Sequence, residues 1–96
     1  MKMLLLVYSS TADEFIIERI KRAGIVHYTK FNDTQGEGLE NDPRLANRIW
    51  PGKNSVLFSV VDEQFIPKTM ETIREMKNEN PRAGIRCFTI PVEDVL

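Results

Sequence analysis

The sequence predicts an α+β fold of the ferredoxin-like type, a βαββαβ sandwich whose four-stranded antiparallel sheet carries two helices on one face. Two observations predict it. Apolar runs and helical patterns alternate along the chain in the order strand, helix, strand, and then repeat that order. Residues 22–29 also match residues 82–89 at five of eight positions, and each copy lies where a predicted helix gives way to a strand.

Length and composition limit what else the chain can be. Its 96 residues suffice for a single domain, expected to cover 1–96, and 13 basic against 14 acidic side chains leave a net charge of -1. This balance argues against nucleic acid as the main partner and the composition against a membrane span. The single Cys87 excludes an internal disulfide and paired-thiol metal sites, which favours a cytoplasmic protein.

The first half of the chain predicts a strand, a helix and a strand. Residues 4–8 form a short apolar run that ends in hydroxyl residues, as a buried strand does and a signal peptide does not. Thr11 with Glu14 has the spacing of a capping box, and Ser10 with Asp13 offers a second register for the same helix start. Gly24 should end the helix, and residues 25–31 should form the second strand.

The second half repeats this order. Residues 56–61 predict a strand and Asp62 can cap the following helix. Pro67 then requires either a later cap or a distorted first turn. The helix should stop before Pro81, and residues 85–90 should form the last strand, ended by Pro91.

The strands are more apolar than a monomer of this fold requires. A two-layer sandwich leaves one sheet face bare, and alternate strand residues should then be polar. Residues 4–7 and 60–61 are instead apolar at every position. We expect the bare face to pack against other copies of the chain, although tolerated surface apolar residues are the alternative.

Residues 32–54 form a connection too long for a routine loop, so the segment is either functional or disordered. Trp50 in it either anchors the loop or stacks on a ligand. The acidic residues Asp33, Glu37, Glu40 and Asp42 make either a solvated polar surface or a site for a hard cation.

Two single residues elsewhere invite a chemical role. His27 is expected to be a half-buried structural histidine inside a strand, and Cys87 a small packed hydrophobe. The sequence contains no nucleophile with its base, no loop pair of catalytic carboxylates and no Walker motif at useful spacing, so we predict no catalysis.

The C-terminal third carries Arg86, Phe88 and the run PVED at residues 91–94. This pattern resembles the last strand of the P-II family of nitrogen-regulatory signalling proteins, which reads GDGKIFV, one residue, then PVEDVI. Arg86 then stands at the family lysine and Phe88 at the phenylalanine. The resemblance implies a homotrimer whose sheets line the interior, a flexible T-loop at about 32–54, and adenine nucleotide (ATP, ADP or AMP) in clefts between subunits.

The resemblance also suggests site residues. In the family T-loop run KGFGRQKG, only Lys30 and Gln35 of this chain match, and Ala83, Gly84 and Ile85 replace the phosphate-cradling GDG. The Ile85 side chain is expected to lie where backbone N–H groups would approach phosphate. The candidate ligand-binding residues are Gln35, Gly36, Gly38, Arg82, Gly84 and Arg86.

The function implied is that of a non-enzymatic sensor. Binding of a small anionic ligand would order the loop and change its contact with a target protein. One alternative is a metal-responsive trimer similar to the divalent-cation tolerance (CutA-like) proteins, with His27 or loop carboxylates as ligands, although His and Cys are sparse. A further alternative is an amino-acid-binding domain of the ACT type, which has the same element order.

Overall fold

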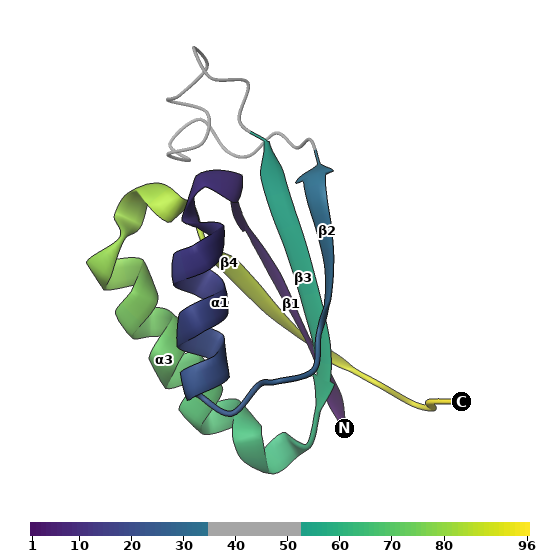
Figure 1. The fold of residues 1–96 in the computed structure, drawn as a ribbon. Helices are drawn as coiled ribbons and strands as arrows, with labels where there is room; N and C mark the ends of the chain where they lie inside the picture. The colour runs from purple at the N-terminus through teal and green to yellow at the C-terminus, as the bar shows by residue number, and fades with distance from the viewer. Residues whose placement is uncertain (35–52) are drawn as a thin grey trace.

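The computed structural model describes residues 1–34 and 53–96, and two helices cover one face of a four-stranded sheet (Figure 1). This confirms the predicted fold class. The strands are β1 (Lys2–Ser9), β2 (Thr29–Thr34), β3 (Asn54–Val61) and β4 (Arg86–Pro91). The helices are α1 (Asp13–Arg22) and α3 (Ile66–Glu79), with short 3-10 turns η1 (Ser10–Ala12), η2 (Glu63–Phe65) and η3 (Pro81–Ala83).

The sheet order is β2-β3-β1-β4, and every neighbouring pair is antiparallel. β1 is central, because its residue Leu5 lies opposite Phe58 on β3 and Phe88 on β4. β2 and β4 are therefore the two edges. In Figure 1 the sheet lies to the right of α1 and α3, and the N-terminus and the C-terminal tail lie near its lower end.

Neither helix begins with the predicted side-chain cap. Thr11 and Ser10 lie in η1, and the residue before α1 is Ala12, which makes no side-chain cap. The Ser10 hydroxyl instead lies 3.0 Å from that of Ser55 on β3, and the Thr11 hydroxyl lies 2.9 Å from that of Ser9. The Ser10 hydroxyl thus has a tertiary partner and the Thr11 hydroxyl a local one, and neither caps the helix.

The second helix adapts to Pro67 as one predicted alternative required. Asp62 precedes the 3-10 turn η2 without a side-chain cap, and its carbonyl accepts a bond from the Phe65 N–H. α3 then starts at Ile66, so Pro67 falls in its first turn, where a missing N–H removes no helical bond. The helix ends at Glu79, before Pro81 as predicted.

The two copies of the repeated segment share one geometry. Gly24 and Gly84 both have positive φ, 99° and 62°, which glycine adopts without the strain that a side chain causes. Ile25 and Ile85 follow them and are each 4% exposed. The copies then diverge, because β4 begins at Arg86 whereas β2 begins only at Thr29. The prediction of a strand from residue 25 was therefore four residues early.

The sheet is apolar on both faces, as the strand sequences predict. The helix-facing residues of β1, namely Leu4, Leu6 and Tyr8, are 0–1% exposed and form the core with Ile16 and Ile73. Strand register places the other large side chains on the opposite face, which we call the open face. Its members on the four strands are Met3, Leu5, Val7, Phe31, Val56, Phe58, Val60, Phe88 and Ile90.

The long connection is shorter than predicted at both ends. β2 continues to Thr34 and β3 starts at Asn54, and the Thr34 hydroxyl donates to the Asn54 carbonyl at 2.9 Å. The rest of the predicted T-loop, with Trp50, Glu37, Glu40 and Asp42, lies outside the described residues.

Candidate functional site

The turn between α3 and β4 presents two arginines. Ala83 and Ile85 are 2% and 4% exposed and hold the turn against the core, while Gly84 turns the chain in the left-handed conformation. Arg82 and Arg86 lie on either side and are exposed. The predicted site residues Arg82, Gly84 and Arg86 thus lie in η3, at the turn after it and at the start of β4, and a guanidinium suits the oxygens of phosphate or carboxylate.

Ile85 does not lie where the comparison with GDG suggested. Its side chain is buried in the core cluster, because the left-handed Gly84 before it turns the next residue inward. The expectation that Ile85 would intrude on a phosphate was wrong. The other predicted site residues, Gln35, Gly36 and Gly38, lie outside the described part of the chain.

A hollow of about 320 Å³ lies where β2 begins beside the far end of β3. Its walls are His27, Tyr28 and Thr29 on one side and Phe58, Ser59 and Val60 on the other. The Ser59 hydroxyl donates to the His27 carbonyl at 2.6 Å and so ties the two walls together. The hollow is open to solvent, and its lining combines aromatic and apolar residues with polar ones, as sites for small organic molecules do.

Sequence reasoning missed this hollow. His27 and Ser59 are 32 positions apart in the chain, and only the pairing of Thr29 with Phe58 brings the two walls together. His27, predicted to be a half-buried strand residue, is exposed and precedes β2. The hollow could have been expected from the predicted fold, because its topology places the start of the second strand beside the end of the third.

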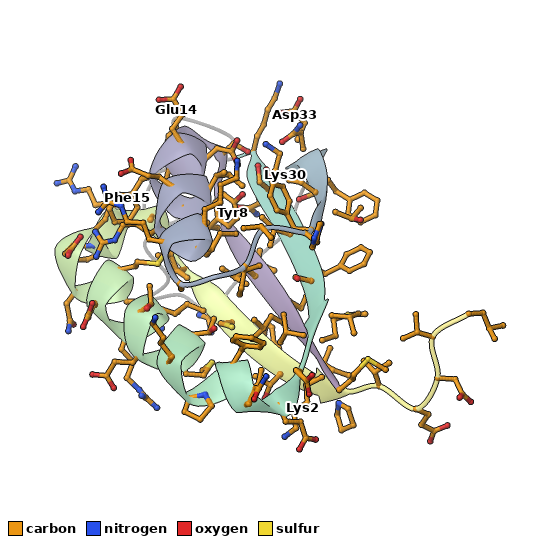
Figure 2. All side chains as sticks on the ribbon, turned by 60° about the horizontal axis from the view of Figure 1, so that its bottom comes forward. Lys2, Tyr8, Glu14, Phe15, Lys30 and Asp33 are labelled. Carbon is orange, nitrogen blue, oxygen red and sulfur yellow. The ribbon has the colours of Figure 1, made fainter. Side chains whose placement is uncertain are left out.

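A polar cluster fastens β2 to the body. The Asp13 carboxylate accepts hydrogen bonds from the Tyr8 hydroxyl and the Lys30 ammonium, each at 2.6 Å. Figure 2 shows Tyr8 and Lys30 close together beside the sheet. One carboxylate at the start of α1 thus joins β1, α1 and β2, a grouping that sequence spacing did not reveal.

The pKa values of this cluster follow from its partners. Burial raises the pKa of the Asp13 carboxyl, but hydrogen bonds from Lys30 and Tyr8 and the charge of Lys30 outweigh it, so the net pKa is below its usual value. Burial and the bond to Asp13 raise the pKa of Tyr8 well above its usual value. At neutral pH Asp13 is therefore ionised and Tyr8 is a neutral donor.

Cys87 behaves as the packed hydrophobe that the sequence predicts. It lies in β4 with its sulfur 3.9 Å from that of Met70, and burial raises its thiol pKa to about 11. The thiolate that reacts or binds metal is therefore scarce at neutral pH.

Metal ligands do not gather in the part of the chain that the structure describes. Within residues 1–34 and 53–96, no three or more His, Cys, Asp or Glu side chains are placed to hold an ion. Over the same residues, no helix is both long and apolar enough to cross a membrane.

Comparison with protein families decides the identity of the chain. The model of the family "nitrogen regulatory protein P-II" matches residues 1–96. The chain belongs to the P-II family. The resemblance seen in the sequence is thereby confirmed. A search of curated proteins found no match.

Solved structures of P-II-like proteins share the fold. CPII from Thiomonas intermedia K12, bound to ADP, AMP and acetate, has a TM-score of 0.69 at 17% identity, over 93% of this chain and 82% of that chain. CPII bound to ADP, AMP and bicarbonate has a TM-score of 0.67 at 18% identity, over 99% and 94% of the two chains. A PII-like signalling protein from Thermus thermophilus has a TM-score of 0.66 at 23% identity, over 92% and 81%.

Proposed function

We propose that this P-II family chain is a non-enzymatic regulator that binds an adenine nucleotide between copies of itself. The main observation behind this proposal is the turn between α3 and β4, which buried Ala83 and Ile85 hold against the core and which Arg82 and Arg86 flank. The P-II family model also matches the whole chain. CPII, which shares the fold, has been solved with ADP and AMP. In this proposal the arginines hold phosphate, and the hollow beside His27 receives the base.

The positions of these two features support a site between subunits. The hollow lies on the β2 edge, level with Met3 and Leu5 of β1, whereas Arg86 lies on the β4 edge, opposite Val7. β2 and β4 are three strand spacings apart, or roughly 14 Å. This separation favours a site in which the hollow and the arginines that contact one ligand come from two copies of the chain.

The open face supplies the reason for association. Phe31 and Phe88 on it are 52% and 49% exposed, and Ile90 is 40% exposed. Apolar side chains gathered on one exposed face favour contact with another apolar face. We propose a homotrimer with these faces inward, formed by a single P-II-like domain with a T-loop-like insertion at about 32–54. Its work is cytoplasmic nitrogen regulation, and the insertion contacts a target protein.

Calorimetry tests the ligand. We expect heat on titration with ATP, ADP or AMP, and Arg86→Gln should weaken binding at least tenfold, because a charge-assisted bond contributes about 1.5–3 kcal/mol. Arg74→Gln is the matched control, since Arg74 is an exposed arginine inside α3, eight residues before Arg82. Absence of heat and of any melting shift with ATP, ADP, AMP and cyclic AMP, with and without magnesium, would contradict nucleotide binding.

Light scattering tests the assembly separately. The wild-type chain should have the mass of a trimer, and Phe88→Lys should dissociate it by placing a charge in the apolar contact. Val26→Lys is the control, because Val26 is 60% exposed but precedes the sheet. A stable wild-type monomer would contradict the trimer and the shared cleft.

A further inference from the structure

β2 has less apolar packing than the strands at the centre of the sheet. Among the described residues it pairs with β3 alone, and within it Lys30 and Thr34 are half-buried while the other residues are exposed. Its one large apolar residue, Phe31, stacks on Phe58 of β3 on the open face, with ring centroids 6.1 Å apart. The pairing of β2 runs from Thr29 to Phe31, shifts register, and resumes at Thr34, with Asp33 in the left-handed region at φ 57°. Hydrogen bonds and charge must therefore supply much of its attachment.

Lys30 provides that attachment on the helix side of the sheet. It lies opposite Leu57, which is 1% exposed, and donates to the Asp13 carboxylate. The side chains of Lys30 and Asp13 are 23% and 28% exposed, so water screens this pair less than a fully exposed one. Tyr8, buried in central β1, donates to the other carboxylate oxygen and fixes its position.

The attached residue is next to the hollow. Thr29 lines the hollow on the β2 side and Lys30 follows it directly, whereas Phe58 and Val60 on the opposite side belong to β3, which has two strand neighbours. A loosened β2 therefore moves one wall of the hollow while the other stays in place.

We propose that Asp13, acting through Lys30, is a positioning residue that holds the β2 wall of the hollow in the conformation that receives the ring of the ligand. This inference rests on the proposed function and adds residues that touch no ligand themselves. The contact between the start of α1 and β2 thereby raises the affinity for the ligand.

The test measures ADP affinity by calorimetry in the full chain. Asp13→Asn and Lys30→Met should each weaken binding about fivefold to tenfold, and the double variant should weaken it no further, because both changes break one contact. Lys30→Arg should restore affinity to within twofold of wild type. Glu14→Gln, which neutralises an exposed carboxylate one residue from Asp13, should leave affinity unchanged.

Hydrogen exchange separates positioning from general destabilisation. In Asp13→Asn, amides of β2 should exchange at least tenfold faster, while those of β1 and β4 change less than twofold. Equal acceleration across the whole sheet would overturn the inference. If Asp13→Asn does not fold, Lys30→Met and Lys30→Arg provide the same comparison.

The binding results test nucleotide binding and the positioning role of Asp13 separately. A wild-type chain that does not bind ADP overturns the proposed function and this inference with it. A wild-type chain that binds ADP, with an Asp13→Asn variant that binds equally well, overturns the positioning role alone.

Discussion

The central strand β1 and the edge strand β2 are held by different forces. β1 pairs on both sides and places Leu4, Leu6 and Tyr8 in the core at 0–1% exposure. β2 pairs on one side, stacks Phe31 on Phe58 at an exposed position, and is attached on the helix side through Lys30 and at its end through Thr34. Apolar burial therefore secures the frame of the fold, whereas polar contacts secure the strand beside the hollow. Changes in charge should affect the second region and spare the first.

The largest effect should come from the core beneath β1. Leu6→Ala removes a fully buried side chain and leaves a cavity, so the free energy of unfolding should fall by about 3 kcal/mol. Urea denaturation measures this change. Thr29→Ala, at an exposed position of β2, should lower the free energy of unfolding far less. Equal losses of stability from the two substitutions would contradict the difference proposed between β1 and β2.

Tyr8 joins the two regions, because its ring lies in the core and its hydroxyl bonds Asp13. Tyr8→Phe keeps the ring and removes the bond, which should lower the free energy of unfolding by about 1 kcal/mol. Thermal denaturation of Tyr8→Phe measures this loss, and Tyr28→Phe, which removes a hydroxyl from another tyrosine, is the control. A Tyr8→Phe protein as stable as wild type would show that the bond adds nothing to the attachment of β2.

Ser59 holds the chain just before β2. Its hydroxyl is buried and donates to the His27 carbonyl, so Ser59→Ala should lower the free energy of unfolding by about 1 kcal/mol or less. Faster hydrogen exchange should be confined to residues near His27 and Thr29. Ser9→Ala, which removes a hydroxyl bonded to exposed Thr11, is the control and should be near neutral.

The smallest effect should be the pH dependence of the contact between Asp13 and Lys30. Because the folded-state pKa of Asp13 is lowered, its stabilisation is fully present above the unfolded-state pKa of about 3.9 and is lost as pH falls through the folded value. The difference in melting temperature between wild type and Asp13→Asn should therefore be constant from pH 7 to 5 and shrink below pH 4. A difference that stays constant down to pH 2 would contradict this.

Local patterns predicted much of the fold. The alternation of apolar runs, the glycines at 24 and 84, and the prolines at 67 and 81 placed the strands and helices in the correct order. The start of β2 was misplaced because Ile25 and Val26 have strand propensity. In the fold Ile25 instead packs in the core and Val26 is exposed before the strand begins.

The candidate site was less predictable. Arg82, Gly84 and Arg86 lie within five residues, so a local motif could identify them, and the structure places them from η3 to the start of β4. The contact of Lys30 with Asp13 joins residues 17 positions apart, and the bond of Ser59 to His27 across the hollow joins residues 32 positions apart. No spacing rule links such residues, because strand register decides which of them meet.

By itself, the sequence determined the order of the helices and strands and the apolar character of both sheet faces. The sequence of the last strand also indicated the P-II family. The order and the apolar character depend on local propensity and on the amount of apolar surface, which composition and periodicity record directly. Only the tertiary structure decided that Ser10 and Thr11 cap no helix, that Ile85 turns inward, and that Asp13 holds Lys30. A polar side chain can bond to any of several partners, and the partner it has in the fold depends on which strands lie side by side.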